Sequence, residues 1–280
     1  MVGRAGWSGS ATVRRVERIE CQWCRVQNAP GTASCVSCGA PLDGRNLVTD
    51  SGWREAPRLR DMTEFRFSNS VVQVEGELVP VTEIALAQGD AVYFEHHVLL
   101  WKDEATPVTA MQTQGGMKRL FGGMPFVLTL AYGPGRVAFS RDSPGELVVL
   151  PLPPGVELDV REHAFLLASH TIGYSFVRIQ GLANVLHGGN GMYLDRFVAA
   201  AAPGLLVLHG YGNVFERWLK PGEKIMVEPG GFLYKDASVT MQAVQMPVKT
   251  GLLRRGMYLA EMTGPGRVGI QSMYVHHHAE

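Results

Sequence analysis

The sequence predicts a mainly β protein that begins with a small cysteine-rich module. Three observations support this fold class. Apolar and polar residues alternate strictly from Val156 to Arg161, as they do in a half-buried strand. The 33 glycines and 16 prolines interrupt the chain too often for a mainly helical protein. All four cysteines lie between Cys21 and Cys38, so any thiol chemistry is confined to one short segment.

The composition is typical of a packed globular protein. Of the 280 residues, 46% are apolar and 19% are charged, and the length suits one large or two unequal domains. The 26 basic and 26 acidic residues give no net charge. Because proteins that bind polyanions over their general surface are usually basic, this balance argues against nucleic acid as a partner.

The N-terminal segment, residues 1–18, is predicted to be a disordered lead-in. Its four arginines are somewhat like those of a mitochondrial transit peptide, but it lacks the apolar run of a secretory signal peptide. The longest apolar stretch of the chain, residues 197–208, is interrupted by Pro203 and is too short to span a bilayer. We therefore expect no transmembrane segment and a cytoplasmic protein.

The four cysteines form two closely spaced pairs. Two residues separate Cys21 from Cys24, ten separate Cys24 from Cys35, and two separate Cys35 from Cys38. Each pair can sit on a tight turn that directs two thiolates at one point, and two such turns complete a tetrahedron around Zn²⁺. Four protein ligands leave no open position, so residues 19–42 are predicted to be a zinc finger with one structural zinc ion.

Two disulfides are the main alternative to a zinc ion. Disulfides require an oxidising compartment, and the sequence offers no export signal. Four free thiols are a second alternative, but free thiols have no reason to occur in paired spacing. The spacing of the cysteines therefore favours zinc.

The cysteine segment resembles the Ran-binding-protein type of zinc finger. That family has an asparagine shortly after the second cysteine, where this chain has Asn28. RNA-binding members use aromatic and arginine side chains in the next loop, where this chain has only small residues from Ala29 to Ser34. Without a group that stacks on a base, the finger is expected to bind a protein rather than RNA. A plain zinc ribbon that ends at Cys38–Pro41 is the other interpretation.

Residues 43–65 are predicted to be a linker. They are polar and charged, contain Gly44, Gly52 and Pro57, and show no sustained periodicity. Trp53 is large and apolar, so we expect it to anchor the linker against the main body.

The rest of the chain, residues 66–275, is predicted to form a β domain. Short apolar segments alternate there with glycine and proline. Leu147–Leu150 and Val239–Gln242 are predicted strands in addition to the alternating segment described above.

Glycine turns recur in this domain at a nearly constant interval. The spacing is 66 residues from Gly89 to Gly155 and 67 residues from Gly155 to Gly222. Each turn opens a stretch of strands that ends on a Pro-Gly turn and a further strand. Such an interval implies three copies of one β unit that pack together. The approximate repeats are 66–152, 153–219 and 220–275.

Glycine-rich motifs in the β domain carry a family resemblance. They occupy Leu120–Val127, Leu186–Leu194 and Glu261–Val268. The region from about Phe67 to Met273 resembles the family of the yeast altered inheritance of mitochondria protein number twenty-four. The resemblance implies triplicated jelly-roll-like units, with a fold like that of the tryptophan RNA-binding attenuation protein. It implies no catalytic residues, because the family has none established.

Histidines are the residues best suited to a second site. Glu95 and His97 fall two positions apart in an apolar segment that reads as a strand, so they share one face and His96 points to the other. A metal site built from Glu95, His97 and either His163 or His170 is conceivable on a jelly-roll. Since no spaced triplet of ligands is visible, hydrogen-bonded histidines in and around the sheet are the favoured interpretation.

No other pattern indicates an enzyme. The sequence has no phosphate-binding loop and no serine nucleophile motif. The last five residues, 276–280, are predicted to be a solvated tail that includes His276–His278. Four further residues are expected in the core or an interface rather than around a cofactor. They are Met192, Tyr193, Met257 and Tyr258.

The predicted function is that of a non-enzymatic scaffold or assembly protein that forms homo-oligomers. Its zinc finger is expected to bind a protein partner. Two alternatives stay open: the finger binds RNA or single-stranded nucleic acid, or the β domain is a cupin-like metalloenzyme.

Overall fold

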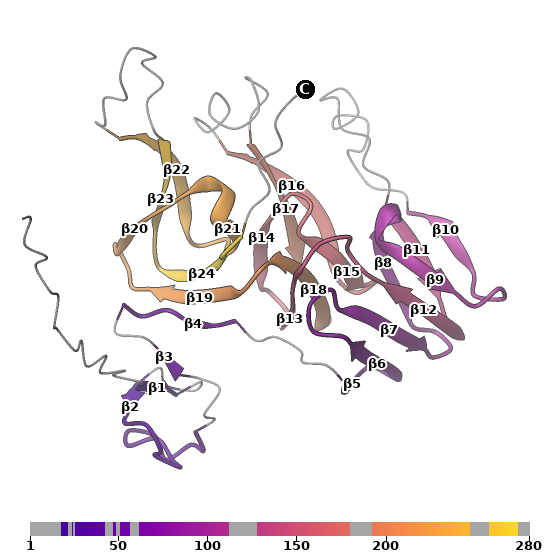
Figure 1. Cartoon of the computed structure of the whole chain (residues 1–280), viewed down its shortest axis with the longest axis horizontal. Helices are drawn as coiled ribbons and strands as arrows, with labels where there is room; N and C mark the ends of the chain where they lie inside the picture. Colours follow the sequence, from indigo (N-terminus) through magenta and orange to yellow (C-terminus); the bar gives the residue numbers. More distant parts are fainter. Residues whose placement is uncertain are drawn as a thin grey trace, which may run out of the picture. The chain divides into compact units, whose positions relative to one another are not determined.

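The computed structural model describes most of the chain as β structure (Figure 1). The residues described are 18–21, 24, 26–42, 47–48, 51–56, 62–111, 128–179, 192–246 and 258–273. They form strands and short 3₁₀ turns, and none of them forms an α-helix, which confirms the mainly β fold class. The chain divides into two compact units, residues 1–54 and 55–280.

The described part of the chain contains no helix long and apolar enough to cross a membrane.

Four short strands form the N-terminal unit up to its boundary. Strand β1 pairs antiparallel with both β2 and β3, and β3 continues to β4. The segment 43–65, for which the sequence shows no periodicity, therefore contains two of these strands. The bounds are β1 (Arg18–Glu20), β2 (Gln27–Asn28), β3 (Leu47–Val48) and β4 (Arg54–Glu55).

The C-terminal unit begins with a hairpin and continues as three sets of six strands. The hairpin is β5 (Thr63–Phe67) and β6 (Ser70–Glu75). The first set is β7 (Val81–Leu86), β8 (Ala91–Glu95), β9 (Leu99–Lys102), β10 (Val108–Ala110), β11 (Leu128–Tyr132) and β12 (Gly135–Phe139). The second is β13 (Gly145–Leu152), β14 (Glu157–Arg161), β15 (Phe165–Ser169), β16 (Gly173–Ile179), β17 (Met192–Val198) and β18 (Gly204–Tyr211). The third is β19 (Val214–Leu219), β20 (Lys224–Val227), β21 (Phe232–Asp236), β22 (Thr240–Gln245), β23 (Tyr258–Thr263) and β24 (Gly266–Gln271).

The three sets use one pairing scheme. In each set the first strand pairs with the sixth, and the sixth also pairs with the third. The second strand pairs with the fifth, and the fifth also pairs with the fourth. All these pairs are antiparallel. The third strand carries a register shift at the same point in every set, next to Leu99, Phe165 and Phe232.

Neighbouring sets are joined through their sheets. The third strand of the second set, β15, pairs with the second strand of the first set, β8. In the same way β21 of the third set pairs with β14 of the second. A sheet of the C-terminal unit therefore contains strands from two successive sets.

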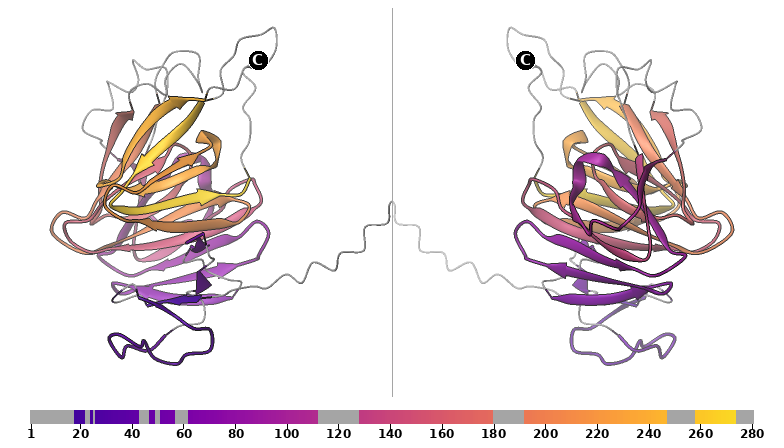
Figure 2. Two further views of the ribbon diagram at one scale, coloured as in Figure 1. Left: turned by 90° about the vertical axis from the view of Figure 1, so that its left-hand side faces the viewer. Right: turned by 90° about the vertical axis from the view of Figure 1, so that its right-hand side faces the viewer.

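Three hydrophobic cores lie between successive sheets of this unit (Figure 2). One core contains Phe94 and Phe139, the next contains Phe165 and Tyr234, and the last contains Phe232 with neighbouring residues of β23 and β24. The sheet of β8, β15 and β18 has a core on each of its faces, because Val92 and Phe94 contribute to one core and Tyr93 to the next. This explains why its strands are continuous apolar runs rather than alternating ones.

The predicted strands are present, with one difference in burial. Leu147–Leu150 lies within β13, and residues 240–242 begin β22. The alternating segment forms β14, but it is not half-buried, because Asp159 is 1% exposed. Its carboxylate is neutralised inside the sheet by Lys235 and Arg196, so a polar residue occupies a buried position.

Most of the glycine-rich motifs lie outside the described residues. This applies to Leu120–Val127, to the first residues of Leu186–Leu194, and to the stretch before Tyr258. Residues 1–17 of the predicted lead-in 1–18 and the tail 276–280 also lie outside them, whereas Arg18 begins β1. The predicted domain and repeat boundaries therefore stay predictions.

Candidate metal centre

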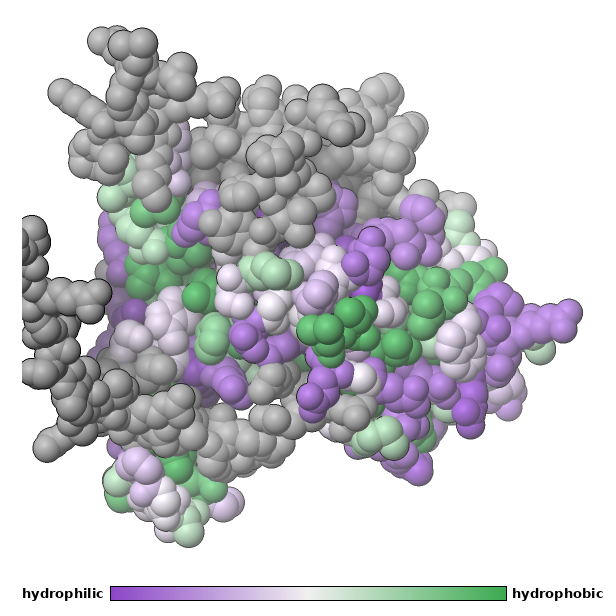
Figure 3. All heavy atoms as spheres, viewed as in Figure 1, coloured by the Kyte–Doolittle hydropathy of each residue, from purple (hydrophilic) through white to green (hydrophobic). Residues whose placement is uncertain are grey.

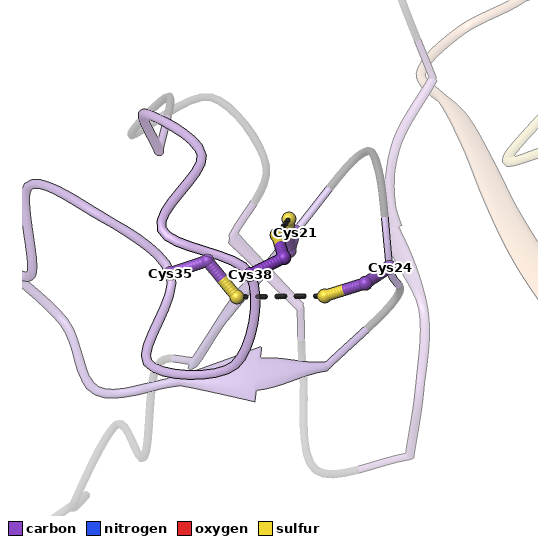
Figure 4. A group of neighbouring side chains, drawn as sticks. All are labelled: Cys21, Cys24, Cys35 and Cys38. Atoms are coloured by element: carbon purple, nitrogen blue, oxygen red, sulfur yellow. Dashed lines mark hydrogen bonds between the residues drawn. The ribbon is translucent and has the colours of Figure 1, made fainter.

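The four cysteine sulfurs lie together in the N-terminal unit. Their Sγ atoms all lie within 4.8 Å of one another. The Sγ atoms of Cys21 and Cys38 are 3.6 Å apart, and those of Cys24 and Cys35 are 3.5 Å apart. These distances are far longer than the sulfur–sulfur bond of a disulfide, which is about 2.0 Å. Figure 4 shows the side chains converging from separate segments of the chain, an arrangement that suits one metal ion.

Two tight turns bring the cysteines to one point. The first turn is closed by the N–H of Cys21, which donates to the carbonyl of Val26 at 3.0 Å. The second is closed by the N–H of Gly39, which donates to the carbonyl of Cys35 at 2.9 Å. Gly39 has a φ of +73°, a conformation that glycine adopts without strain, so the chain can turn directly after Cys38.

Asn28 connects the two turns. It is 4% exposed, and its amide nitrogen donates to the carbonyl of Val26 at 2.8 Å. The same nitrogen lies 3.7 Å from Cys35 Sγ, and Asn28 Oδ1 accepts the N–H of Val36 at 2.9 Å. The asparagine on which the finger resemblance rests therefore positions the third cysteine.

Backbone donors favour the thiolate form of one cysteine. The N–H of Cys38, followed by that of Ser37, lowers the pKa of Cys35 to about 6. The pKa of Cys38 instead rises to about 12: the N–H of Ala40 opposes the rise, while the hydrogen bond to Cys24 and burial cause it. Four thiols this close cannot all ionise unless a cation compensates their charge, and a metal ion supplies that charge.

The module also exposes apolar side chains. Val36 is 76% exposed and Val26 is 36% exposed. Gln22, Trp23 and Arg25, which lie between the first two cysteines and just beyond, are outside the described residues.

The histidine pair of the β domain does not lie in a strand, contrary to the sequence-based expectation. β8 ends at Glu95, and His96 and His97 form a 3₁₀ turn before β9 begins. The reason is that β8 and β9 belong to different sheets, so the chain must turn between them. His97 nevertheless faces Glu95, with Nε2 3.1 Å from its Oε2.

An arginine occupies the other side of the Glu95 carboxylate. Arg141 Nη2 lies 3.5 Å from Glu95 Oε2 and donates to the carbonyl of Phe165 at 2.8 Å. Burial, and then the positive charge of Arg141, lowers the pKa of His97 to about 4. A guanidinium this close to the carboxylate repels a cation, which makes the pair a poor metal ligand set.

The other predicted candidates are spread over the unit. His170 Nδ1 lies 3.2 Å from the carbonyl of Ala91, and His163 stands in the turn before β15 with a φ of +66°. The ring of Tyr193 packs against Phe176, Tyr258 lies in β23, and Met257 is outside the described residues. Among the residues described, only the four cysteines form a group of three or more potential metal ligands.

Sequence reasoning missed two buried polar residues in this region. Arg141 is 7% exposed, and His209 is fully buried with its Nε2 3.1 Å from the carbonyl of Ser143. Neither lies in a recognisable motif. His209 directly follows a run of apolar residues, Leu205 to Leu208. That position in the sequence is the one signal that its side chain is buried.

Comparison with known proteins supports one family. The sequence matches the family described as "Mitochondrial biogenesis AIM24" over residues 72–273. The fold is similar to the X-ray crystal structure of protein SPYM3_0169 from Streptococcus pyogenes, with a TM-score of 0.58 and 17% sequence identity. This similarity covers 73% of the chain and 94% of that chain, and it concerns the fold alone. No curated protein is significantly similar to the sequence. Because the family match spans all three strand sets and most of the chain, the protein belongs to the AIM24 family, as its glycine motifs indicate.

Proposed function

We propose that this protein is a non-enzymatic assembly protein of the AIM24 family whose N-terminal module binds one structural Zn²⁺ ion and docks a protein partner. The observation that carries the proposal is the closed set of four cysteine sulfurs within 4.8 Å of one another. A set of four thiolates completes a tetrahedron and leaves no position for a substrate or a reactive water. The role of such an ion is to hold a short segment folded.

The sulfur spacing supports zinc as the metal. A regular tetrahedron with zinc–sulfur bonds of about 2.3 Å has sulfur–sulfur edges of about 3.8 Å. The distances of 3.6 Å from Cys21 to Cys38 and 3.5 Å from Cys24 to Cys35 are close to that value. Cysteine thiolates also prefer zinc to the harder cations Mg²⁺ and Ca²⁺.

One feature supports a role in protein binding, and two further features support a non-enzymatic role. Val36 lies on the second cysteine turn, and its large exposed fraction, 76%, offers an apolar contact to a partner. The absence of an open coordination position at the cysteine site removes the means of metal catalysis there. The buried Glu95, which has Arg141 beside it, is likewise better suited to a structural ion pair than to a reactive centre.

Native mass spectrometry of the full chain tests the metal. We expect one zinc ion per chain, and its loss when Cys24 or Cys38 is replaced by serine. Cobalt substitution gives a second measurement, because four thiolates around Co²⁺ produce the intense visible absorption of a tetrahedral site. A chain that carries no zinc contradicts the proposal, and so does a second tightly bound metal that survives both serine substitutions.

A further inference from the structure

In the described part of the C-terminal unit, β9 and β20 each leave one strand edge unpaired. β9 is the last strand of one sheet and β20 is the last strand of another. Within the described ranges, β9 pairs only with β12 and β20 pairs only with β23. The two edges lie at opposite ends of this unit (Figure 1). Neighbouring sets are joined by the pairs β15–β8 and β21–β14, and these two contacts are called the joins below. The corresponding pair of the first and third sets, β9 with β20, is not formed among the described strands.

The unpaired strands are equivalent to strands that do pair at the joins. β9 is the third strand of its set, as are β15 and β21, and Trp101 is the first residue paired after the register shift, like Leu167 and Tyr234. β20 is the second strand of its set, as are β8 and β14. The free edge of β9 therefore corresponds to the paired edges of β15 and β21, and the free edge of β20 corresponds to those of β8 and β14.

β8 and β20 can be aligned residue by residue, because each pairs with a fifth strand that ends at an equivalent glycine turn. Val227 pairs with Ala260, and Phe94 pairs with Thr129. Ala260 lies four residues before Gly264, and Thr129 lies four residues before Gly133. Val227 is therefore equivalent to Phe94, which pairs with Leu167 at the existing join.

This alignment defines the register of the missing pairing. At the two existing joins, Phe94 is opposite Leu167 and Val160 is opposite Tyr234. The equivalent residues at the free edges are Val227 and Trp101. The next pair along, equivalent to Tyr93 with Ala168 and to Asp159 with Lys235, is Met226 with Lys102.

Two apolar residues of β9 are exposed although their equivalents at the joins are buried. Leu166 and Leu233 are fully buried, whereas the equivalent Leu100 is 56% exposed. Leu167 and Tyr234 are fully buried, whereas Trp101 is 40% exposed.

On β20 the contrast holds at Met226 but not at Val227, which is 8% exposed and packs in a core as its equivalents Phe94 and Val160 do. Tyr93 is fully buried and Asp159 is 1% exposed, whereas Met226 is 45% exposed. Figure 3 shows apolar residues at the surface near β20 to β23 and again around β9 to β12. An exposed apolar strand edge is a site for pairing with another chain unless charges or prolines block it.

We propose that β9 of one copy of this chain pairs antiparallel with β20 of a second copy, with Trp101 opposite Val227 and Lys102 opposite Met226. The inference rests on the proposed function as an assembly protein and specifies its contact. The two edges are different surfaces, so the contact is head-to-tail, and repetition produces a closed ring or an open filament. A second copy is the occupant that fits, because its β20 repeats the strand that β15 and β21 already use as partner within the chain.

Two single substitutions test the contact, one on each edge. Trp101→Glu places a charge on the β9 edge, and Met226→Glu places one on the β20 edge. Leu78→Glu is the matched control, because Leu78 is 71% exposed and lies on neither edge. Native mass spectrometry and light scattering over a dilution series measure the assembly, and thermal unfolding shows that each variant is folded.

Each edge variant alone is expected to weaken self-association by about 30-fold or more, since it removes a central apolar contact. The control is expected to assemble like the wild type. In an equal mixture, the β20 edge of the Trp101→Glu chain can still pair with the β9 edge of the Met226→Glu chain. The mixture is therefore expected to form dimers that contain one chain of each kind and grow no further.

Three results overturn the edge pairing. If the wild type assembles and both folded edge variants assemble equally well, another surface is used, and the proposed assembly function stands without this contact. If the mixture stays monomeric while each edge variant is folded, the contact is not head-to-tail. If the wild type is monomeric throughout the dilution series, self-assembly fails together with the contact, while the zinc measurement still decides the N-terminal module.

Discussion

Asn28 holds the third cysteine of the candidate metal site from two directions. Its amide nitrogen lies 3.7 Å from Cys35 Sγ, and its carbonyl oxygen accepts the N–H of the next residue, Val36, at 2.9 Å. The side chain is 4% exposed, so water replaces neither contact easily. Hydrogen bonds to a ligand sulfur stabilise the thiolate and fix its direction.

Replacing Asn28 with alanine is therefore expected to weaken metal binding by about 10–100-fold, the usual effect of losing such a partner of a ligand. Competition with a chromophoric chelator measures the affinity. Thr32→Ala is the control, because Thr32 is only half-buried and its hydroxyl makes a solvent-exposed hydrogen bond to the carbonyl of Ala29. Equal affinities for the two variants contradict a role of Asn28 at the metal site.

A second prediction concerns the buried ion pair of Asp159 and Lys235. Lys235 Nζ lies 2.6 Å from the Asp159 carboxylate, and both side chains are less than 5% exposed. Asp159→Ala leaves the ammonium group buried without this partner, so we expect a loss of about 3–5 kcal/mol in the free energy of unfolding. Urea denaturation measures it. Glu83→Ala, which removes the partner of the exposed Arg136, is the control and should cost less than about 1 kcal/mol.

The same pair predicts a loss of stability in acid. Burial raises the pKa of Asp159, but the hydrogen bond from Arg196 and the charge of Lys235 outweigh burial and lower it below the usual value. A carboxyl with a lowered pKa in the folded state stabilises the protein above its unfolded pKa, about 3.9, and this stabilisation is lost as the pH falls through the folded value. The Asp159→Ala variant should therefore lose less stability below pH 4 than the wild type, and an equal loss contradicts the assignment.

His209 predicts a separate effect at milder pH. Burial, and then the charge of Arg141, lowers its pKa to about 4 from the usual value of 6.5. Between these values the unfolded chain binds a proton that the folded chain does not bind, so stability falls as the pH decreases. From pH 7.5 to pH 5 this contributes a loss of about 2 kcal/mol.

Urea denaturation at the two pH values measures this loss. His209→Gln retains a donor for the carbonyl of Ser143 and should remove most of the loss. A His209 resonance that titrates near pH 6.5 in NMR spectra of the folded protein contradicts this prediction.

A further prediction concerns Gly135, the first residue of β12. Its φ is +146°, and a Cβ built there would lie 2.2 Å from Thr106 Oγ1, whose side chain is buried. Gly135→Ala should therefore destabilise the protein by about 2 kcal/mol or more, through backbone strain and overlap together. Gly155→Ala is the matched control: its φ is +83° but nothing lies within 4 Å, so only the backbone cost of about 1 kcal/mol remains. Thermal or urea unfolding of both variants measures the difference, and equal costs contradict the overlap.

Local patterns in the sequence predicted some elements well and others poorly, for identifiable reasons. The strand at Leu147–Leu150 could be predicted because its residues are apolar on both sides of β13. The segment around Glu95 could not be divided into two strands, because apolar residues continue from β8 through Val98 to β9 while the chain changes sheets. Periodicity describes one strand at a time and contains no information on which sheet a strand enters.

The burial of charged residues was also beyond local reasoning. Asp159 occupies a position that reads as solvent-facing, yet Lys235, 76 residues further along, neutralises it. The contact between Glu95 and Arg141 likewise joins residues that are far apart in the sequence, and neither residue lies in a motif. Such pairs depend on which strands become neighbours in the sheets. The local spacing of residues in one sequence does not show which strands will pair.

The sequence by itself determined the composition of the cysteine site, the mainly β class and the family, because each depends on residue types at short or regular spacing. The paired cysteines need only two tight turns, and glycine and proline limit segment length whatever the tertiary structure. Only the tertiary structure decided that His96 and His97 form a turn, that Arg141 lies against Glu95, and that β9 and β20 each pair on one side only among the described strands. These features depend on strand pairing over long distances in the chain, where the free energy comes from burial between sheets rather than from local conformation.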